Sequence, residues 1–323
     1  MKFFKSAKWL TVLVGLFLLV GLNLTEGAVK DKEKYEEKFA KTVSLAKEGE
    51  VVLVNISGQI DVKTWDRGEV KIDALKVSKA STLEKAKENA AKVKIVVKKE
   101  GNILKIETEY PESKKEWKQD SINVSVNYNL TIPSKASAKI TSVSGNVDLE
   151  EIGGVVKVKL VSGNVTIKKA LKGVDIDGVS GNIVVQDVTG DAYLNAVSGK
   201  INARGIKGSI KAAVVSGEIE LRDVSSADKV EASAVSGSIV YEGQISSDGR
   251  YTLSSHSGKI EMIIPSDSGF ELEAKTFSGS IHSDFEVKVS GEISKRKISG
   301  VVNRGGAVVK LSTFSGNVYL KKR

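Results

Sequence analysis

The chain has 323 residues, and its apolar residues are mainly Val, Ile, Leu and Ala with only 6% aromatics, a composition typical of β-rich proteins. It contains no cysteine, which excludes disulfides, thiolate metal sites and a lipid-modified N-terminal cysteine. The formal net charge of +9 could attract anionic polymers, lipid headgroups or nucleic acid, but the charges alternate in sign along most of the chain, which favours a solvated surface and argues against a nucleic-acid site.

The N-terminus has the layout of a secretory signal peptide. Three lysines precede an apolar run from Trp9 to Leu24, which is too short to span a bilayer comfortably. We assign residues 1–27 to the signal peptide and expect the mature chain to be exported, either extracellular, periplasmic or associated with the cell surface. An uncleaved membrane anchor is the alternative.

Residues 28–140 are predicted to hold N-terminal strands, a first coil and one helical insertion. Strands are expected over Phe39–Leu45 and Val51–Ile56, followed by a first Ser-Gly pair. The segment 81–94 has a helical pattern, with Ser81 as the expected N-cap and Glu84 three residues later. Such a helix could cover an end of a strand stack, because open β-edges invite aggregation.

Residues 141–323 contain an internal repeat of Ser-Gly, a polar residue, and Val or Ile. Copies begin at Ser144, Ser162, Ser180, Ser198, Ser216, Ser236, Ser257, Ser278 and Ser315, with an earlier copy at Ser57. From Ser144 onward the spacings are 18, 18, 18, 18, 20, 21, 21 and 37 residues. The repeat therefore predicts equivalent structural units that become less regular after about residue 269.

Each period contains two short alternating segments. In the period from Ser162 to Val179, Val165 and Ile167 alternate with polar residues, a turn follows near Gly173, and a second alternation begins at Val174. A unit of two strands cannot bury an apolar face alone, so neighbouring units must stack. The sequence thus predicts an all-β fold, a single-stranded parallel β-helix (β-solenoid) with about 18–21 residues per coil and one short helical insertion.

Equivalent positions form columns when the units are stacked. The residue before each Ser-Gly is Val143, Val161, Val179, Val197, Val215 and Val235, followed by His256, Phe277 and Phe314. We interpret this column as inward-facing, because β-branched side chains pack well on a pleated sheet. On that interpretation Val197→Asp would prevent folding. The glycine is expected to supply the positive φ of a tight corner, and the asparagines that follow several of them to tolerate left-handed geometry.

Charged columns give an independent test of this stacking. The pairs that fall one period apart are Glu150 with Lys168, Glu151 with Lys169, Lys157 with Asp175, and Lys159 with Asp177. In stacked coils each pair would lie one strand spacing apart, about 4.8 Å, with opposite signs facing each other. These pairs predict the same register as the Ser-Gly repeat.

The chain resembles the bacterial putative-adhesin domain family, a β-strand-repeat family of unknown function. The resemblance covers about residues 35–323 and rests on the Val-Ser-Gly-Asn-Val segments, on Ser57–Asp66 (SGQIDVKTWD) and on Tyr128–Pro133 (YNLTIP). It implies a single-stranded β-helix exported to the cell envelope. The family brings no established catalytic residues, so the resemblance assigns none here.

Residues capable of catalysis or metal binding are sparse, and we predict no catalytic, cofactor-binding or metal-binding residue. His256 stands in the column interpreted as inward, which favours a core or coil-end histidine over a catalytic base. His282 and Asp284 would share one strand face, yet a triad also needs a placed nucleophile and an oxyanion site. Asp175 and Asp177 have a spacing that could flank a glycosidic bond, but their stacking partners include lysines, which favours an ion-pair ladder.

We therefore predict a non-catalytic secreted or cell-envelope protein, an adhesin-like scaffold or binding module. The candidate partners are an anionic cell-wall polymer, a glycan, a membrane surface or an envelope protein. Lys168, Lys169, Arg204 and Arg222 form a broken basic stripe that could meet an anionic polymer. The alternatives are a carbohydrate-active β-helix enzyme and a membrane-anchored envelope-stress or signalling ectodomain.

Overall fold

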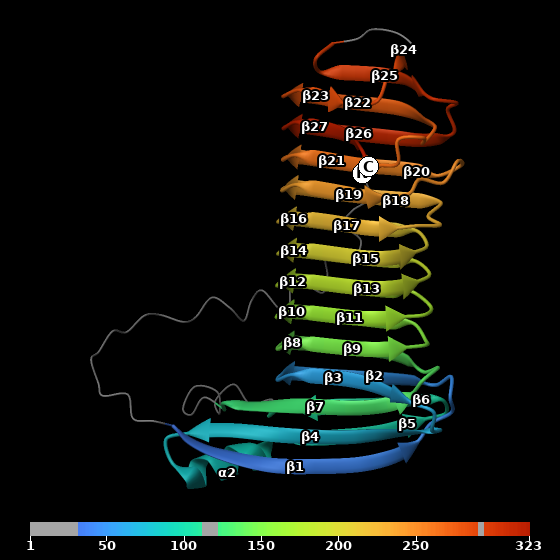
Figure 1. Cartoon of the computed structure of the whole chain (residues 1–323). Helices are drawn as coiled ribbons and strands as arrows, with labels where there is room; N and C mark the ends of the chain where they lie inside the picture. The colour runs from blue at the N-terminus through green and yellow to red at the C-terminus, as the bar shows by residue number, and fades with distance from the viewer. Residues whose placement is uncertain (1–31, 112–121, 290–293) are drawn as a thin grey trace, which may run out of the picture. The chain divides into compact units, whose positions relative to one another are not determined.

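The computed structural model describes residues 32–111, 122–289 and 294–323. Contacts between Cα atoms separate Met1–Lys32 from a second unit, Glu33–Arg323, which is compact. The second unit is an all-β solenoid in which two sheets enclose one apolar core, as the sequence predicted (Figure 1). The signal peptide predicted for residues 1–27 lies outside the described residues. In the described ranges, no helix is both long enough and apolar enough to cross a membrane.

The first sheet consists mostly of the strands that follow each Ser-Gly pair. In spatial order its described strands are β1 (Glu33–Ser44), β4 (Glu69–Ala80), β7 (Val124–Pro133), β3 (Ile60–Trp65), β9 (Val147–Ile152), β11 (Val165–Ala170), β13 (Ile183–Thr189), β15 (Ile201–Lys207), β17 (Ile219–Val224), β19 (Ile239–Gly243), β21 (Ile260–Ile264), β27 (Val318–Lys322) and β23 (Ile281–Ser283).

The second sheet consists mostly of the strands that lead into each Ser-Gly pair. In spatial order its described strands are β24 (Lys288–Val289), β25 (Lys297–Val302), β22 (Phe270–Ser278), β26 (Ala307–Ser315), β20 (Arg250–Ser257), β18 (Lys229–Ser236), β16 (Ile210–Ser216), β14 (Ala192–Ser198), β12 (Val174–Ser180), β10 (Val156–Ser162), β8 (Ser137–Ser144), β2 (Glu50–Ser57), β6 (Ile103–Glu109) and β5 (Lys94–Glu100).

The coils stack in parallel with a register of one repeat. Val158 pairs with Ile176, and Ser162 pairs with Ser180, so residues 18 positions apart lie on adjacent rungs. The inward side chains of both strands, such as Val165 and Ile167, are at most 1% exposed. Each buried aliphatic side chain contributes about 1.5–3 kcal/mol relative to an exposed one, so the continuous core is the main source of stability. The predicted period and register are confirmed.

The valine column before each Ser-Gly faces solvent, and the inward orientation predicted for it is wrong. Val197, Val215 and Val235 are 41%, 48% and 52% exposed. Side chains alternate between the two faces of a strand. Because Val158 and Leu160 point into the core, the next residue in β10 must point outward.

The glycine of each Ser-Gly pair is required for two reasons. Gly181 has φ +127°, a conformation that side chains other than glycine rarely adopt. A Cβ atom at Gly181 would also overlap the carbonyl oxygen of Gly163 on the preceding coil, and the same overlap recurs along the stack. The predicted positive φ is confirmed, and the close approach of successive coils is a second constraint on the same residue.

The asparagines after these glycines form a ladder between coils. Their φ angles are not positive, so the left-handed geometry predicted for them is wrong. Instead, the Oδ1 of Asn146 accepts the backbone N–H of Asn164 at 3.0 Å, and the Oδ1 of Asn164 accepts the backbone N–H of Asn182 at 3.0 Å. Each side chain thereby satisfies a corner N–H that the sheet ladders do not reach.

The predicted charge columns are confirmed in register. Lys169 and Glu151 form an ion pair at 2.7 Å, and Lys159 lies 3.8 Å from Asp177. Lys168 pairs with Glu150 and Lys157 with Asp175 as rung neighbours. Exposed pairs of this kind contribute about 0–1 kcal/mol each, so they specify register more than they add stability.

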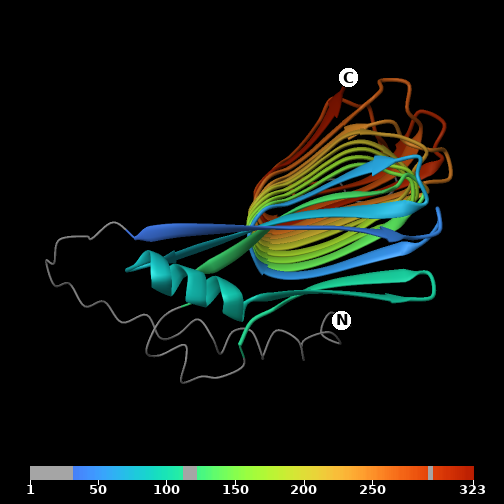
Figure 2. The same ribbon diagram turned by 90° about the horizontal axis from the view of Figure 1, so that it is seen from below.

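The N-terminal end of the stack is closed by antiparallel strands and a helix. β4 pairs antiparallel with both β1 and β7, and β5 pairs antiparallel with β6. The helix α2 (Leu83–Lys92) packs on β1 and β4 beside the coils (Figure 2). Its N-cap is Thr82, whose Oγ1 accepts the backbone N–H of Lys85 at 3.2 Å, so the prediction of Ser81 is wrong by one residue. The predicted first coil is confirmed, since β2 pairs with β8 and β3 with β9.

The C-terminal end is closed by a coil that is out of sequence order. β26 lies between β20 and β22, and β27 lies between β21 and β23, in parallel register on both sides (Figure 1). β25 then pairs antiparallel with β22, and the two-residue β24 ends the sheet. The coil formed by residues 307–322, the last in the chain, thus occupies the next-to-last place in the stack.

An ion cluster ties this last coil to its neighbour and should make stability depend on pH. The Glu261 carboxylate receives the ammonium groups of Lys259 and Lys321, each at 2.6 Å, and these hydrogen bonds hold its pKa below the ordinary value of 4.5. Because the pKa of Glu261 is lower in the folded than in the unfolded protein, its ionised carboxylate stabilises the fold above about pH 4.5. This contribution is lost as the pH falls through the lowered pKa. We expect the stability advantage of the wild type over Glu261→Gln to shrink below about pH 4.5 in urea titrations. An advantage that stays constant from pH 7 to pH 3 would contradict this assignment.

Candidate binding surface

The residues that precede each Ser-Gly pair form a continuous apolar line on one corner of the solenoid. We call this line the corner stripe. In spatial order it consists of Ile56, Val143, Val161, Val179, Val197, Val215, Val235, His256, Phe314 and Phe277. With about 4.8 Å between rungs, it extends for roughly 43 Å. Its side chains range from half-buried at Val143 to 67% exposed at Phe277.

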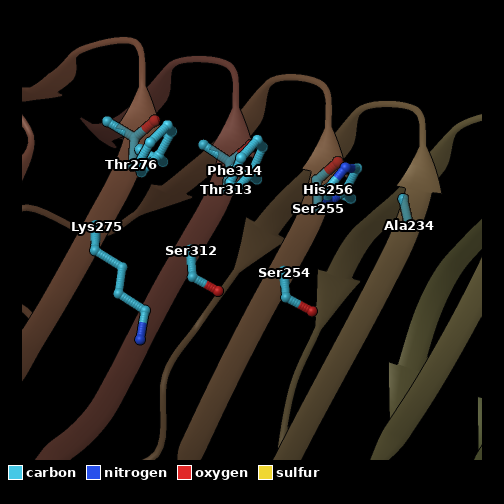
Figure 3. A pocket seen from close by; sticks show the side chains of 10 residues that line it. Ala234, Ser254, Ser255, His256, Lys275, Thr276, Ser312, Thr313 and Phe314 are labelled. Carbon is cyan, nitrogen blue, oxygen red and sulfur yellow. The ribbon is translucent and has the colours of Figure 1, made fainter.

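The corner stripe ends in three stacked rings. The ring centroids of His256 and Phe314 are 4.9 Å apart with planes 8° from parallel, and those of Phe314 and Phe277 are 4.7 Å apart with planes 5° from parallel. These separations match the spacing of the strands that carry the rings (Figure 3). The backbone ladder therefore fixes the rings in a flat, exposed apolar row.

A shallow groove of about 610 Å³ runs beside these rings. Ser254, Ser312 and Lys275 line its outer side from three adjacent strands (Figure 3). The buried hydroxyl groups beneath it are already used by the scaffold: Ser255 donates to the carbonyl oxygen of Gly237 and Thr276 to that of Gly316, both at 2.9 Å. The groove thus offers hydroxyl groups at its rim on a rigid floor.

A second row of polar groups borders the corner stripe on its other side. In the repeat copies from Ser144 to Ser315, the serine that follows each corner-stripe residue is exposed. Because the glycine beside it has no side chain, the serine hydroxyl and the stripe residue before it are both open to a large partner. Each rung from β8 onward therefore presents one hydrophobic side chain, or a ring, next to one hydroxyl.

The basic stripe proposed from the sequence is largely paired with acids. Arg204 binds Asp223 at 2.9 Å and Arg222 binds Glu242 at 2.7 Å, while Lys169 binds Glu151. Pairs between adjacent rungs reduce the net positive field along this face.

Of the residues considered for catalysis, His256 lines the groove, whereas Asp177, His282 and Asp284 lie outside its lining and serve the scaffold. The Asp177 carboxylate accepts the side-chain amide of Asn195 at 3.0 Å and lies near Lys159, as expected for an ion-pair ladder. His282 stacks on Tyr319 with centroids 5.1 Å apart, and Asp284 accepts the backbone N–H of Lys322. His256 is exposed in the corner stripe, so its predicted core position is wrong. Across residues 32–111, 122–289 and 294–323, no group of three or more His, Asp or Glu side chains is placed to hold a metal ion.

The sequence contains evidence that this surface is exposed, which the inward assignment of the residues before each Ser-Gly pair overlooked. Counting the alternation outward from Val158 places every residue before a Ser-Gly pair on the solvent side. The change from valine to His256, Phe314 and Phe277 then predicts an exposed aromatic end to an exposed apolar row.

The sequence model of a family described as Toastrack DUF4097 matches residues 49–321. No curated protein matches the sequence. Solved structures that match the chain include a putative lipid binding protein from Parabacteroides distasonis (12% identity, TM-score 0.42, covering 87% of this chain and 96% of that one) and a putative adhesin from Bacteroides fragilis (13%, TM-score 0.38, 89% and 97%). A putative cell adhesion protein from Clostridium sporogenes is also similar (11%, TM-score 0.26, 90% and 100%). Similarity at this level carries no argument about function.

Proposed function

The chain belongs to the Toastrack DUF4097 family, whose description names no activity, and from that premise we propose that it is an exported, non-catalytic binding scaffold. This membership confirms the resemblance to a β-strand-repeat family of unknown function. We further propose that the scaffold is adhesin-like and that its ligand is an extended, uncharged glycan lying along the corner stripe.

The observation that supports this proposal is that successive rungs each present an apolar side chain next to a serine hydroxyl. A polymer binds such a ladder best when its own repeat is close to the strand spacing of about 4.8 Å. Sugar rings in an extended glycan present C–H faces to apolar side chains and hydroxyl groups to hydrogen-bonding partners. The aromatic end adds the larger contact area that ring side chains provide.

The distribution of charge supports a neutral ligand over an anionic one. Three of the four residues in the basic stripe, Lys169, Arg204 and Arg222, form ion pairs with acids on neighbouring rungs. The corner stripe itself contains no lysine, arginine, aspartate or glutamate. Attraction to an anionic polymer would depend on unpaired charges and would fall steeply with salt.

Two features support a binding role without catalysis and an exported location. Asp175 and Asp177 are the two acids whose spacing could suit glycoside hydrolysis, and both stand in a ladder: Asp175 is the rung neighbour of Lys157, and the Asp177 carboxylate lies 3.8 Å from Lys159 and accepts the side-chain amide of Asn195. The N-terminal residues 1–27 have the pattern of a secretory signal, which supports an exported protein whose ligand lies outside the cytoplasm.

Binding to a panel of neutral and anionic glycans, with the full chain at low and moderate salt, tests the proposal. We expect binding to neutral glycans that persists at moderate salt and weakens by about 5- to 30-fold in Phe277→Ser, because an exposed aromatic contact contributes about 1–2 kcal/mol. Tyr193→Ser is the matched control, since Tyr193 is 48% exposed on the same sheet but lies off the corner stripe. Equal losses in both variants, or binding that disappears at moderate salt, would contradict the proposal, and turnover of the glycan would overturn the non-catalytic role.

A further inference from the structure

The coil of residues 307–322, which we call the C-terminal coil, is held entirely by segments that precede it in the chain. β26 pairs with β20 on one side and β22 on the other, and β27 pairs with β21 and β23. Its inward side chains, such as Val309 and Leu311, are at most 1% exposed. Nearly all of its stability therefore comes from the position between the coils of β20–β21 and β22–β23, which we call the insertion slot.

A coil fits the insertion slot when its strands align in register with the strands on both sides. Ser315 pairs with Ser257 on one face and with Ser278 on the other, so all three Ser-Gly corners align. Ser257 and Ser278 are 21 residues apart, the same spacing as Ser236 and Ser257, which are direct rung neighbours. The coils that flank the slot could thus also stack on each other, and any coil with the Ser-Gly pattern could separate them.

The segment that leads into the C-terminal coil has the features of a hinge. Residues 303–306 connect β25 to β26, and Asn303, Gly305 and Gly306 have φ angles of 53°, 73° and 122°. Left-handed geometry is less favourable for asparagine than for glycine, so the backbone at Asn303 stores a modest strain that an extended conformation would release. The Asn303 side-chain amide donates to the carbonyl oxygens of Ser266 and Ser268, at 3.4 and 2.6 Å, and extension of the turn would have to break these two hydrogen bonds. Short strained hinges favour exchange of the element that follows them between copies of a protein.

We infer that the insertion slot binds the C-terminal coil of a second copy of this chain, so that the protein assembles by coil exchange. The contacts inside the slot are identical in the closed monomer and in the exchanged pair. The balance between the two forms then depends on hinge strain, which favours exchange, and on protein concentration. This assembly does not depend on the proposed glycan ligand.

The absence of native cysteine allows a direct test with single-cysteine variants of the full chain. Ser254 and Ser312 are outward rung neighbours across the slot, and Ser233 and Ser254 are outward rung neighbours in coils that are consecutive in the chain. Chains carrying Ser254→Cys and Ser312→Cys, distinguished by tag mass, are refolded together and oxidised. The matched control mixes Ser254→Cys with Ser233→Cys. The double variant Ser254→Cys/Ser312→Cys in one chain reports whether the slot is filled.

We expect the Ser254→Cys and Ser312→Cys mixture to form mixed disulfides at least about tenfold more than the control mixture, with a yield that rises with protein concentration during refolding. We expect the double variant refolded at high dilution to form its disulfide within one chain. Equal yields in the two mixtures would overturn coil exchange. Failure of the double variant to close its disulfide would show that the C-terminal coil does not occupy the slot, which would overturn the inference as well.

Discussion

Gly181→Ala is expected to lower the free energy of unfolding by about 3–5 kcal/mol, a large part of the stability of a typical protein. Two costs combine at this residue. The φ of +127° is unfavourable for any residue with a side chain, and the added methyl group would overlap the carbonyl oxygen of Gly163. Relief of that overlap requires two coils to separate locally, which weakens the sheet ladders on both sides of the corner. Urea unfolding followed by circular dichroism measures the change.

Gly178→Ala is the matched control in the same strand. Gly178 does not have a positive φ, and an added Cβ would lie 3.5 Å from the Cδ1 of Ile183, an ordinary contact. Neighbouring coils already carry alanine or valine in this column, at Ala196 and Val214. We expect stability to be unchanged or to rise by up to about 1 kcal/mol, because alanine restricts the unfolded chain more than glycine does. Similar losses in both variants would show that the Ser-Gly glycine has no special constraint.

The stacking of the regular coils could be predicted because equal spacing between repeats in a solenoid requires equivalent residues to lie on adjacent rungs. Residues one period apart occupy adjacent rungs, so the opposite charges of Glu151 and Lys169 had to face each other if the period was correct. The sequence also determines that Val161 and its equivalents point to solvent. This follows from the in-and-out alternation that begins at Val156, and not from the fact that the column consists of valine. Residue type alone predicted burial and was misleading.

The order of the last coils could not be predicted from the repeat. Every Ser-Gly coil fits every other in the same register, so nothing in the pattern indicates that the coil of Ser315 separates those of Ser257 and Ser278. The row of three stacked rings depends on this order, because Phe314 reaches His256 and Phe277 only from the insertion slot. The stacking order of the three rings could therefore not be predicted, although the residues themselves were visible in one column of the sequence.

Leu194→Asp is expected to prevent cooperative folding, the largest effect of any single substitution considered. Leu194 is 0% exposed on β14, where it pairs in register with Ile176 and Ala212 at the centre of the core. An unpaired carboxylate buried there costs several kcal/mol or more, comparable with the whole stability of a domain. Leu194→Ala should remain folded with a loss of about 2–5 kcal/mol, which gives a measurable value for the same site.

Val197→Asp, three residues further along the same strand, is expected to fold with a loss below about 1 kcal/mol. Val197 is 41% exposed in the corner stripe, so its carboxylate would remain in water. The two aspartates thus differ only in the face of β14 that carries them, and thermal unfolding of the purified variants separates the outcomes. A soluble, cooperative Leu194→Asp variant beside an unfolded Val197→Asp variant would reverse the facing of the strand. It would also place the corner stripe inside the core, where no ligand could reach it.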